Sequence, residues 1–271
     1  MKDLYGVLGH PVSHSMSPKI FNAAFKKANI KAEYDFFDVE PENLETFIEE
    51  LSKNNIKGLS VTIPHKVSVM KFLDNISEKA AKIGAVNTVI NDGGILKGEN
   101  FDVDGAMEAL EEKTKIKKRK IVVLGAGGAA RAIINGLSEN KCEVLILSRN
   151  EDLEEATKLA EEYNSKIDIL DKFHQYSEET EILINATPVG MSPKIKETPI
   201  NTKSLHKDTL VFDIVYNPQC TQLLKDAMEV GCDIQTGDKM FIHQAAKQFE
   251  FWTGEKAPLK VMEKILKKEL K

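Results

Sequence analysis

Short apolar runs alternate with amphipathic segments along the whole chain. Runs bounded by glycine, proline or polar residues predict strands, and apolar residues recurring every three or four positions predict helices. The first hundred residues give strands at 4–9, 34–39, 58–63 and 85–90. Helices are predicted at 18–28, where Ser17 precedes Pro18 as an N-cap, at 41–54, and from 102 to 110.

The second half repeats the strand–helix alternation more regularly. Strands are predicted at 121–124, 143–147, 181–185, 210–215 and 232–235, with helices between most of them and helices at 238–252 and 259–270. This order predicts a doubly wound parallel sheet, preceded by another α/β unit. The polar segment 111–120 is interpreted as the end of an interdomain helix plus a linker, and the two halves are expected to form a cleft.

The most informative motif follows the strand predicted at 121–124. That strand runs into Gly125-Ala126-Gly127-Gly128-Ala129, and an apolar helix comes next. Glycines in such a turn let the backbone approach a pyrophosphate, and the helix N-terminus offers it unpaired N–H groups. The motif therefore predicts a dinucleotide site. The alternative is a tight strand–helix turn in a flavodoxin-like sheet that binds no ligand.

The kind of nucleotide is indicated at the end of the second strand of this sheet. An acidic residue there accepts hydrogen bonds from a ribose 2′-OH and repels a 2′-phosphate. This chain has Ser148-Arg149-Asn150 instead, and an arginine pairs well with a phosphate. NADP is therefore favoured, with NAD as the alternative. The acidic run 151–155 opposes this preference, and Arg149 is otherwise a surface residue before a helix predicted at 151–163.

Composition narrows the class of protein. The chain has 271 residues, 42% of them hydrophobic and 29% charged, with a net charge of −5. We therefore expect neither nucleic acid nor a membrane as a partner. The three cysteines and six histidines show no metal-ligand spacing, and the N-terminus shows no apolar leader. These features predict a cytoplasmic protein with free thiols and no metal.

Polar residues gather at the ends of predicted strands in the first half, where open α/β sheets place their chemistry. The segments 13–18, 61–66, 84–88 and 98–102 contribute Ser15, Ser17, Thr62, Lys66, Asn87 and Asp102. Each residue has a plainer explanation as a helix N-cap, a turn residue or a solvated lysine. Together, hydroxyls, an amide, a lysine and a carboxylate suit a small substrate with several hydroxyls, with or without a carboxylate.

The motifs of both halves, taken in order, resemble those of the shikimate dehydrogenase family over essentially the whole chain. They are SxSP (15–18), VTIPHK (61–66), GAVNT (84–88), GENFD (98–102), GAGGAAR (125–131), NATPVGM (185–191), DIVYNP (213–218) and GxxMxxxQ (237–244). The resemblance implies reversible NADPH-dependent reduction of 3-dehydroshikimate to shikimate, a step of aromatic amino-acid biosynthesis. It also allows a homodimer.

The resemblance further implies an α/β fold of two domains. Residues 1–103 with the C-terminal helices 239–271 would form the substrate domain, and residues 104–238 a Rossmann-type cofactor domain. Lys66 and Asp102 would be the catalytic pair. The substrate would be bound by Ser15, Ser17, Thr62, Asn87, Gln244 and Tyr216. The cofactor would be bound by Gly125, Ala126, Gly127, Gly128, Ala129, Ser148, Arg149, Thr187, Val215, Gly237 and Met240.

Three positions depart from the family pattern. Phe101 stands where the family usually has threonine, Ser148-Arg149-Asn150 where NADP-type members often have Asn-Arg-Thr, and Leu153 where many have a second arginine. One guanidinium is then left for a 2′-phosphate, so the NADP preference is expected to be modest. The alternatives are a quinate/shikimate dehydrogenase with relaxed use of NAD and NADP, and a non-catalytic ligand-sensing paralogue.

Overall fold

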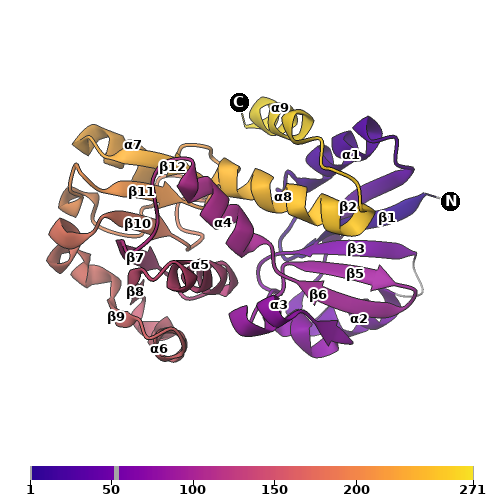
Figure 1. The fold of residues 1–271 in the computed structure, drawn as a ribbon, viewed down its shortest axis with the longest axis horizontal. Coiled ribbons are helices and arrows are strands. Elements are labelled where there is room, and N and C mark those ends of the chain that lie inside the picture. Colours follow the sequence, from indigo (N-terminus) through magenta and orange to yellow (C-terminus); the bar gives the residue numbers. More distant parts are fainter. Residues whose placement is uncertain (1, 52–54, 271) are drawn as a thin grey trace. The chain divides into compact units, whose positions relative to one another are not determined.

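The computed structural model describes residues 2–51 and 55–270 and consists of two compact units (Figure 1). Unit 1 comprises Met1–Asp102 and Gln244–Lys271, and unit 2 comprises Val103–His243. Both boundaries fall at helices. The helix α4 (Asp102–Glu111) begins at the last residue of the first segment, and α8 (Gly237–Thr253) starts in unit 2 and ends in unit 1.

In the described part of unit 1, six strands form a mixed sheet in the order β2-β1-β3-β5-β6-β4. β1 pairs in parallel with β2 and β3, whereas β5 is antiparallel to β3 and β6. The short β4 is parallel to β6. The strands are β1 (Asp3–Gly9), β2 (Ala32–Asp38), β3 (Ile56–Val61), β4 (Asn75–Ile76), β5 (Thr88–Asp92) and β6 (Ile95–Glu99).

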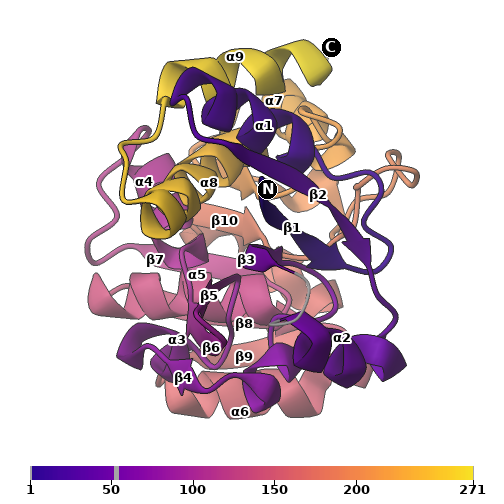
Figure 2. The same cartoon turned by 90° about the vertical axis from the view of Figure 1, so that its right-hand side faces the viewer.

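Helices cover both faces of this sheet (Figure 2). On one face α2 (Leu44–Leu51) and α3 (Glu78–Ile83) pack on apolar residues such as Leu59 and Val61. On the other face α1 (Ser17–Lys27) lies beside α9 (Leu259–Glu269), and the end of α8 brings Trp252 against the sheet. Only a glycine fits opposite this indole, because a Cβ at Gly58 would lie 2.6 Å from its Nε1.

Six strands described for unit 2 form an all-parallel sheet in the order β12-β11-β10-β7-β8-β9. Both faces of its central strand are buried. Ile121 and Val123 pack in the cluster that contains α5, and Val122 and Leu124 in the cluster that contains α7. The elements are β7 (Lys120–Leu124), α5 (Gly128–Glu139), β8 (Glu143–Ser148), α6 (Leu153–Glu162), β9 (Lys166–Ile169), β10 (Ile182–Asn185), β11 (Leu210–Asp213), α7 (Gln222–Val230) and β12 (Asp233–Thr236).

The predicted fold class is confirmed, with local corrections. Ser17 is not an N-cap: α1 begins at Ser17 itself, and Met16 precedes it without a side-chain capping bond. The strand expected at 85–90 starts only at Thr88. The helix expected at 41–54 is a 3₁₀ turn followed by α2, and positions 52–54 lie outside the described residues. The elements α3, β4, β6 and β9 were not predicted.

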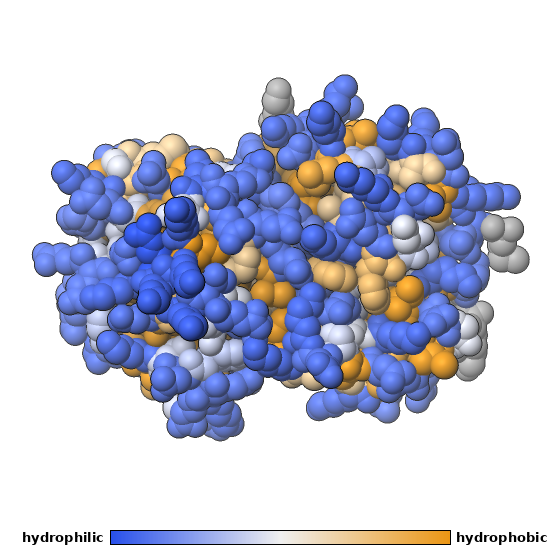
Figure 3. All heavy atoms as spheres, viewed as in Figure 1, coloured by the Kyte–Doolittle hydropathy of each residue, from blue (hydrophilic) through white to orange (hydrophobic). Residues whose placement is uncertain are grey.

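Hydrophilic residues dominate the face shown in Figure 3, and hydrophobic ones appear in scattered patches. The large exposed hydrophobic residues are dispersed along the chain as Phe36, Ile63, Val67, Ile95, Ile195, Met228, Val230 and Phe251. Among the residues described, no helix has the length and apolar character needed to cross a membrane.

Candidate active site

A largely buried lysine–carboxylate pair lies at one edge of the unit 1 sheet. Nζ of Lys66, in the loop after β3, donates to Oδ2 of Asp102 at 2.5 Å. Asp102 is the first residue of α4, and its backbone N–H donates to the side chain of Asn100. The Asn100 amide also bonds the Ala85 carbonyl at 2.9 Å, which ties the start of the helix to the loop before β5. Asp102 is therefore fixed by the backbone on either side of it, and Lys66 is held by its contact with Asp102.

Asn87 connects this pair to a second polar side chain. Its Nδ2 donates to Oδ1 of Asp102 at 2.9 Å and to Oε1 of Gln244 at 3.4 Å. Its Oδ1 accepts from the backbone N–H of Phe101 and from the hydroxyl of Thr88. Four predicted site residues from distant parts of the sequence, Lys66, Asn87, Asp102 and Gln244, are thus brought together by hydrogen bonds.

The three predicted hydroxyl residues follow the carboxyl ends of β1 and β3: Ser15 and Thr62 lie in loops, and Ser17 is the first residue of α1. These strands are parallel, so their carboxyl ends share one edge of the sheet. Ser15 and Ser17 contact each other, with 3.2 Å between their hydroxyl oxygens. Thr62 packs closely on the end of β1, where a Cβ at Gly9 would lie 2.5 Å from its methyl carbon. The three hydroxyl residues therefore lie at the same edge of the sheet.

Sequence reasoning missed Gln248, which contacts Asn87 and Thr88 from α8. Its Nε2 donates to the backbone carbonyl of Asn87 at 3.1 Å and to Oγ1 of Thr88 at 2.9 Å. Gln248 follows Gln244 by four positions and shares its helix face. A second glutamine at this spacing, beside buried Ala245 and Phe249, was the available signal.

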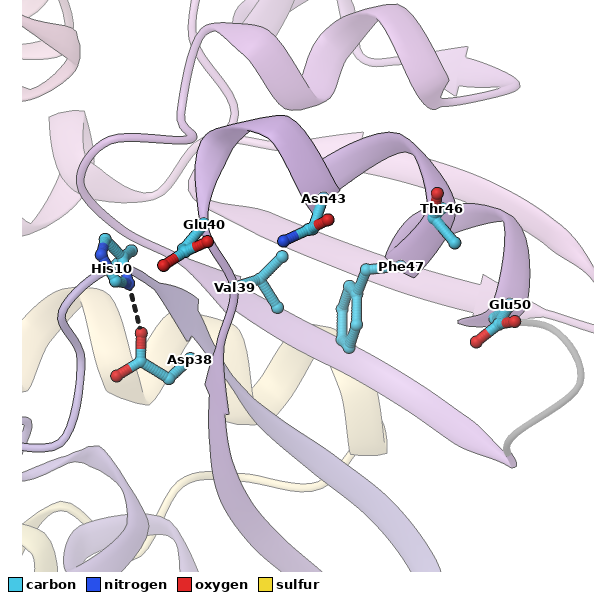
Figure 4. Close-up of a pocket in the computed structure, with 8 residues that line it drawn as sticks. All are labelled: His10, Asp38, Val39, Glu40, Asn43, Thr46, Phe47 and Glu50. Atoms are coloured by element: carbon cyan, nitrogen blue, oxygen red, sulfur yellow. Dashed lines mark hydrogen bonds and ion pairs between the residues drawn. The ribbon is translucent and has the colours of Figure 1, made fainter.

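Unit 1 also contains a surface pocket of about 490 Å³, shown in Figure 4. Its side chains come from the ends of β1 and β2 and from the segment containing α2. His10 and Asp38 are hydrogen-bonded at one side, with Nδ1 and Oδ1 2.7 Å apart. The lining residues are His10, Asp38, Val39, Glu40, Asn43, Thr46, Phe47 and Glu50, so this pocket is separate from the residues predicted for the site.

The glycine turn of unit 2 leaves open space beside its backbone at the start of α5. Gly125 has φ +97°, a conformation that favours glycine, and a Cβ there would lie 2.9 Å from the methyl carbon of Thr187. A Cβ at Gly127 would meet nothing within 4 Å. No side chain caps α5 at Gly127, and its first turn lacks acidic residues, so its amides suit an anion. This open, uncapped turn fits a dinucleotide.

Polar side chains tie together the loops that follow β10 and β11. Asn185 accepts from the N–H and hydroxyl of Thr187, and its Nδ2 donates to Asp213 at 3.0 Å. Asp213 also accepts from the N–H of Val215 and, at 2.6 Å, from the hydroxyl of Thr221. Burial raises the pKa of Asp213 to about 6, although all three hydrogen bonds act to lower it. This carboxylate fixes the backbone that carries Thr187 and Val215.

The residues at the end of β8 differ in exposure. Ser148 is buried, and its hydroxyl oxygen has no hydrogen-bond partner among residues 2–51 and 55–270. Arg149 is exposed and is held by two acidic neighbours: Nη2 lies 2.6 Å from Oδ2 of Asp152, and Nη1 lies 3.2 Å from Oε1 of Glu151. These contacts, that with Asp152 above all, raise the pKa of the Arg149 guanidinium. The arginine is charged and already engaged by carboxylates.

The remaining predicted residues also lie in unit 2. Gly237 begins α8 in a place too tight for a side chain, because a Cβ would lie 2.3 Å from the Ile214 carbonyl oxygen. Met240 is buried in the core of the unit, and Tyr216 stacks on Phe241 with ring centroids 4.3 Å apart. Within residues 2–51 and 55–270, no group of three or more His, Cys, Asp or Glu side chains could hold a metal ion.

An uncapped glycine turn on a doubly wound sheet, with a buried lysine–aspartate pair in a second α/β unit, defines a nicotinamide-nucleotide oxidoreductase. Three family profiles match: Shikimate dehydrogenase substrate binding domain at residues 7–89, Shikimate / quinate 5-dehydrogenase at 107–227, and Shikimate 5'-dehydrogenase C-terminal domain at 239–267. The chain belongs to the shikimate dehydrogenase family, as its motifs predicted.

Relatives and solved structures match over nearly the full length. The shikimate dehydrogenase (NADP(+)) of Methanobrevibacter smithii is 47% identical over 98% of this chain and 97% of its own. A shikimate dehydrogenase crystallised with NADP+ is 39% identical, with a TM-score of 0.91 over 100% of this chain and 96% of its own. The Thermus thermophilus enzyme in complex with NADP(H) and shikimate is 34% identical, with a TM-score of 0.89 over 99% of both chains.

Proposed function

We propose that this protein catalyses the reversible reduction of 3-dehydroshikimate to shikimate, with NADPH as the reductant, in aromatic amino-acid biosynthesis. The observation that carries the proposal is the Lys66–Asp102 pair, set among hydrogen-bonding groups at the edge of the unit 1 sheet. Unit 1 would bind shikimate and unit 2 the nucleotide.

Lys66 and Asp102 have complementary roles in this reaction. When bound, the reduced nicotinamide supplies a hydride to the carbonyl carbon. The oxygen of that carbonyl then gains negative charge, and the Lys66 ammonium stabilises it and donates a proton. Asp102 orients the ammonium through this contact. Asn87 donates to the other carboxylate oxygen and so fixes the plane of the carboxylate.

The hydroxyl and amide groups around the pair suit a substrate with several hydroxyls. Ser15, Ser17, Thr62 and Gln244 would bind these hydroxyls, and Tyr216 would lie near the substrate and the nicotinamide. Sites built to bond a hydroxyl discriminate strongly against analogues that lack it, by up to ~10⁴. This set therefore supports recognition of the substrate ring as well as catalysis.

In unit 2 the glycine turn would hold the pyrophosphate. Gly125, Ala126, Gly127, Gly128 and Ala129 supply its backbone, and Arg149 would meet the 2′-phosphate beside Ser148. Thr187, Val215, Gly237 and Met240 would also bind the cofactor. A cytoplasmic location is consistent with Cys142, Cys220 and Cys232, which are free thiols.

The test is an absorbance assay at the reduced-nicotinamide band. The purified protein is offered shikimate with NADP and, separately, with NAD, and both series are repeated with quinate. We expect the highest kcat/KM with shikimate and NADP. Absence of hydride transfer despite tight binding of shikimate and nucleotide would point to a ligand-sensing paralogue instead.

One observation favours a second candidate, a quinate/shikimate dehydrogenase with relaxed cofactor use. Arg149 is engaged by Asp152 and Glu151, which compete with a 2′-phosphate for the same guanidinium. The ratio of kcat/KM values for NADP and NAD in the same assay decides between a strict and a relaxed enzyme.

A further inference from the structure

A continuous chain of buried hydrogen bonds runs through unit 1 and ends on Asn87. The hydroxyl of Tyr34 donates to Ser60 at 2.6 Å, and Ser60 donates to Oε1 of Gln248 at 2.7 Å. Nε2 of Gln248 donates to Thr88 at 2.9 Å, and the Thr88 hydroxyl donates to Oδ1 of Asn87 at 2.6 Å. All five residues are buried.

The direction of this chain is fixed by two backbone groups. Gln248 also bonds the backbone carbonyl of Asn87, which can only accept, so this end of the Gln248 amide must be the NH₂ group. Because Thr88 accepts from that group, its own proton is available for Oδ1 of Asn87. The N–H of Phe101 can only donate and points to the same oxygen. Two donors therefore define which end of the Asn87 side chain is oxygen.

The orientation of the Asn87 amide decides what Asp102 faces. As observed, Nδ2 of Asn87 lies 2.9 Å from Oδ1 of Asp102 and donates to it. A rotated amide would place an oxygen there, against a carboxylate whose side chain is only 6% exposed. In a buried site such oxygen–oxygen repulsion is poorly screened. Asp102 would then move and carry the Lys66 ammonium with it.

We infer that Gln248, acting through Thr88, is a positioning residue that locks the Asn87 amide and thereby the geometry of the Lys66–Asp102 pair. This role rests on the proposed function, because it assumes that the pair does the chemistry. Gln248 lies one helical turn beyond Gln244 on the same face of α8. The helix α8 thus supplies both Gln244, which is proposed to bind substrate, and Gln248, which positions the catalytic pair without contacting it.

The test uses isosteric changes along the chain. Thr88→Val removes the hydroxyl but keeps the side-chain shape, and Gln248→Met removes both donors of the amide. We expect kcat with shikimate and NADP to fall roughly ten- to a hundredfold in each, since small misplacements of catalytic groups are costly. Thr88→Ser restores the hydroxyl and should keep kcat within about twofold of wild type.

Thr209→Val is the matched control. It removes an equally buried threonine hydroxyl, which donates to the Thr180 carbonyl in unit 2, away from this chain of bonds. Its kcat should stay near the wild-type value, even where its thermal midpoint falls. Thr88→Val keeps the bond from the Phe101 N–H to Asn87 and the bond from Gln248 to the Asn87 carbonyl. It therefore tests the inference even if Gln248→Met does not fold.

A double variant separates positioning from general damage. If both residues act through Asn87, Thr88→Val combined with Gln248→Met should lower kcat no further than the worse single change. Shikimate binding, measured by calorimetry without nucleotide, should weaken less than kcat falls. Additive losses in kcat, or wild-type kcat in Thr88→Val, would overturn the inference. Wild-type protein without shikimate oxidation would instead overturn the proposed function.

Discussion

Nζ of Lys66 lies 2.5 Å from Oδ2 of Asp102, and the two side chains are only 15% and 6% exposed. The Lys97–Asp92 pair of the same unit has a similar separation of 2.6 Å but leaves 45% and 64% exposed. Exposed pairs are weakened by solvent, whereas buried ones hold a defined geometry and are damaged when one partner is removed. Burial therefore distinguishes the Lys66–Asp102 pair, whose geometry suits proton transfer, from a solvent-exposed surface ion pair.

The first prediction concerns this pair. Lys66→Met should lower kcat by ~10²–10⁴, the range that general acid–base catalysis supplies, because the proton leaving the reacting shikimate hydroxyl then lacks the side chain proposed to accept it. Steady-state rates with shikimate and NADP give kcat, and a thermal melt reports folding. Lys97→Met, which breaks the exposed pair, is the matched control. Near-full turnover of a folded Lys66→Met protein would remove Lys66 from the mechanism.

The predicted hydroxyl residues should affect binding more than turnover. Ser15→Ala and Thr62→Ala each remove one hydroxyl from the substrate side of the sheet edge, so KM for shikimate should rise roughly two- to tenfold. The value of kcat should change less, because these groups bind substrate and transition state about equally. Ser177→Ala, which removes a hydroxyl bonded to the His174 carbonyl in unit 2, serves as the control. A fall in kcat at unchanged KM would argue against a binding role.

Much of the fold was predictable because its signals are local. The strand–glycine turn–helix motif at 121–139 needs only neighbouring residues, and an all-parallel sheet buried on both faces leaves continuous apolar strands such as β7. The strands that were not predicted lack such a continuous apolar run. β6 (Ile95–Glu99) contains a lysine, a glycine and a glutamate, and β9 (Lys166–Ile169) alternates charged and apolar residues at the sheet edge. Their pairing comes from tertiary contacts.

The proposed site residues could be named from sequence motifs, but the hydrogen bonds among them could not. Lys66, Asn87 and Asp102 each belong to a sequence motif. The hydrogen bonds among them, however, join segments that lie far apart in the sequence. The start of the first helix was predicted one residue too late, because a serine before proline suggests an N-cap, whereas α1 begins at Ser17 itself. In the structure its backbone N–H bonds the hydroxyl of Ser15 instead. Gln248 acts through two intermediates, and only a structure reveals such a relation.

Nucleotide preference should respond to the acidic neighbours of Arg149. Asp152→Asn removes the carboxylate that contacts both Nε and Nη2 of the guanidinium, leaving it freer for a 2′-phosphate. The ratio of kcat/KM for NADP over NAD should rise roughly two- to fivefold, the scale of an exposed ion pair. Because the Asp152 side chain makes no capping bond to α6, the change removes no hydrogen bond from the helix.

The matched control for this change is Glu154→Gln. It breaks the exposed Lys158–Glu154 pair on the same helix, where Nζ and Oε1 are 2.6 Å apart, without touching Arg149. Its NADP/NAD ratio should equal that of the wild type. An unchanged or lower ratio in Asp152→Asn would show that Arg149 does not meet the 2′-phosphate in the proposed way.

The last prediction follows from the buried carboxylate of Asp213. Burial raises its pKa from 3.8 to about 6 in the folded protein, so between these values the folded state holds a proton that the unfolded state has lost. The free energy of unfolding should therefore fall as pH rises through this window, by an amount on the order of 3 kcal/mol from this group, and then level off. In Asp213→Asn this part of the slope should vanish.

Urea unfolding of both proteins between about pH 4 and pH 7 measures the difference. Asp168→Asn in the same unit is an informative control, because bonds from Lys172 and Tyr176 lower the pKa of Asp168 to about 2. Its stabilisation is complete above about pH 5 and is lost as pH falls further, so the slope between pH 5 and 7 should match the wild type. If Asp213→Asn keeps the wild-type slope, Asp213 is already ionised throughout, and its three hydrogen bonds outweigh the cost of burial.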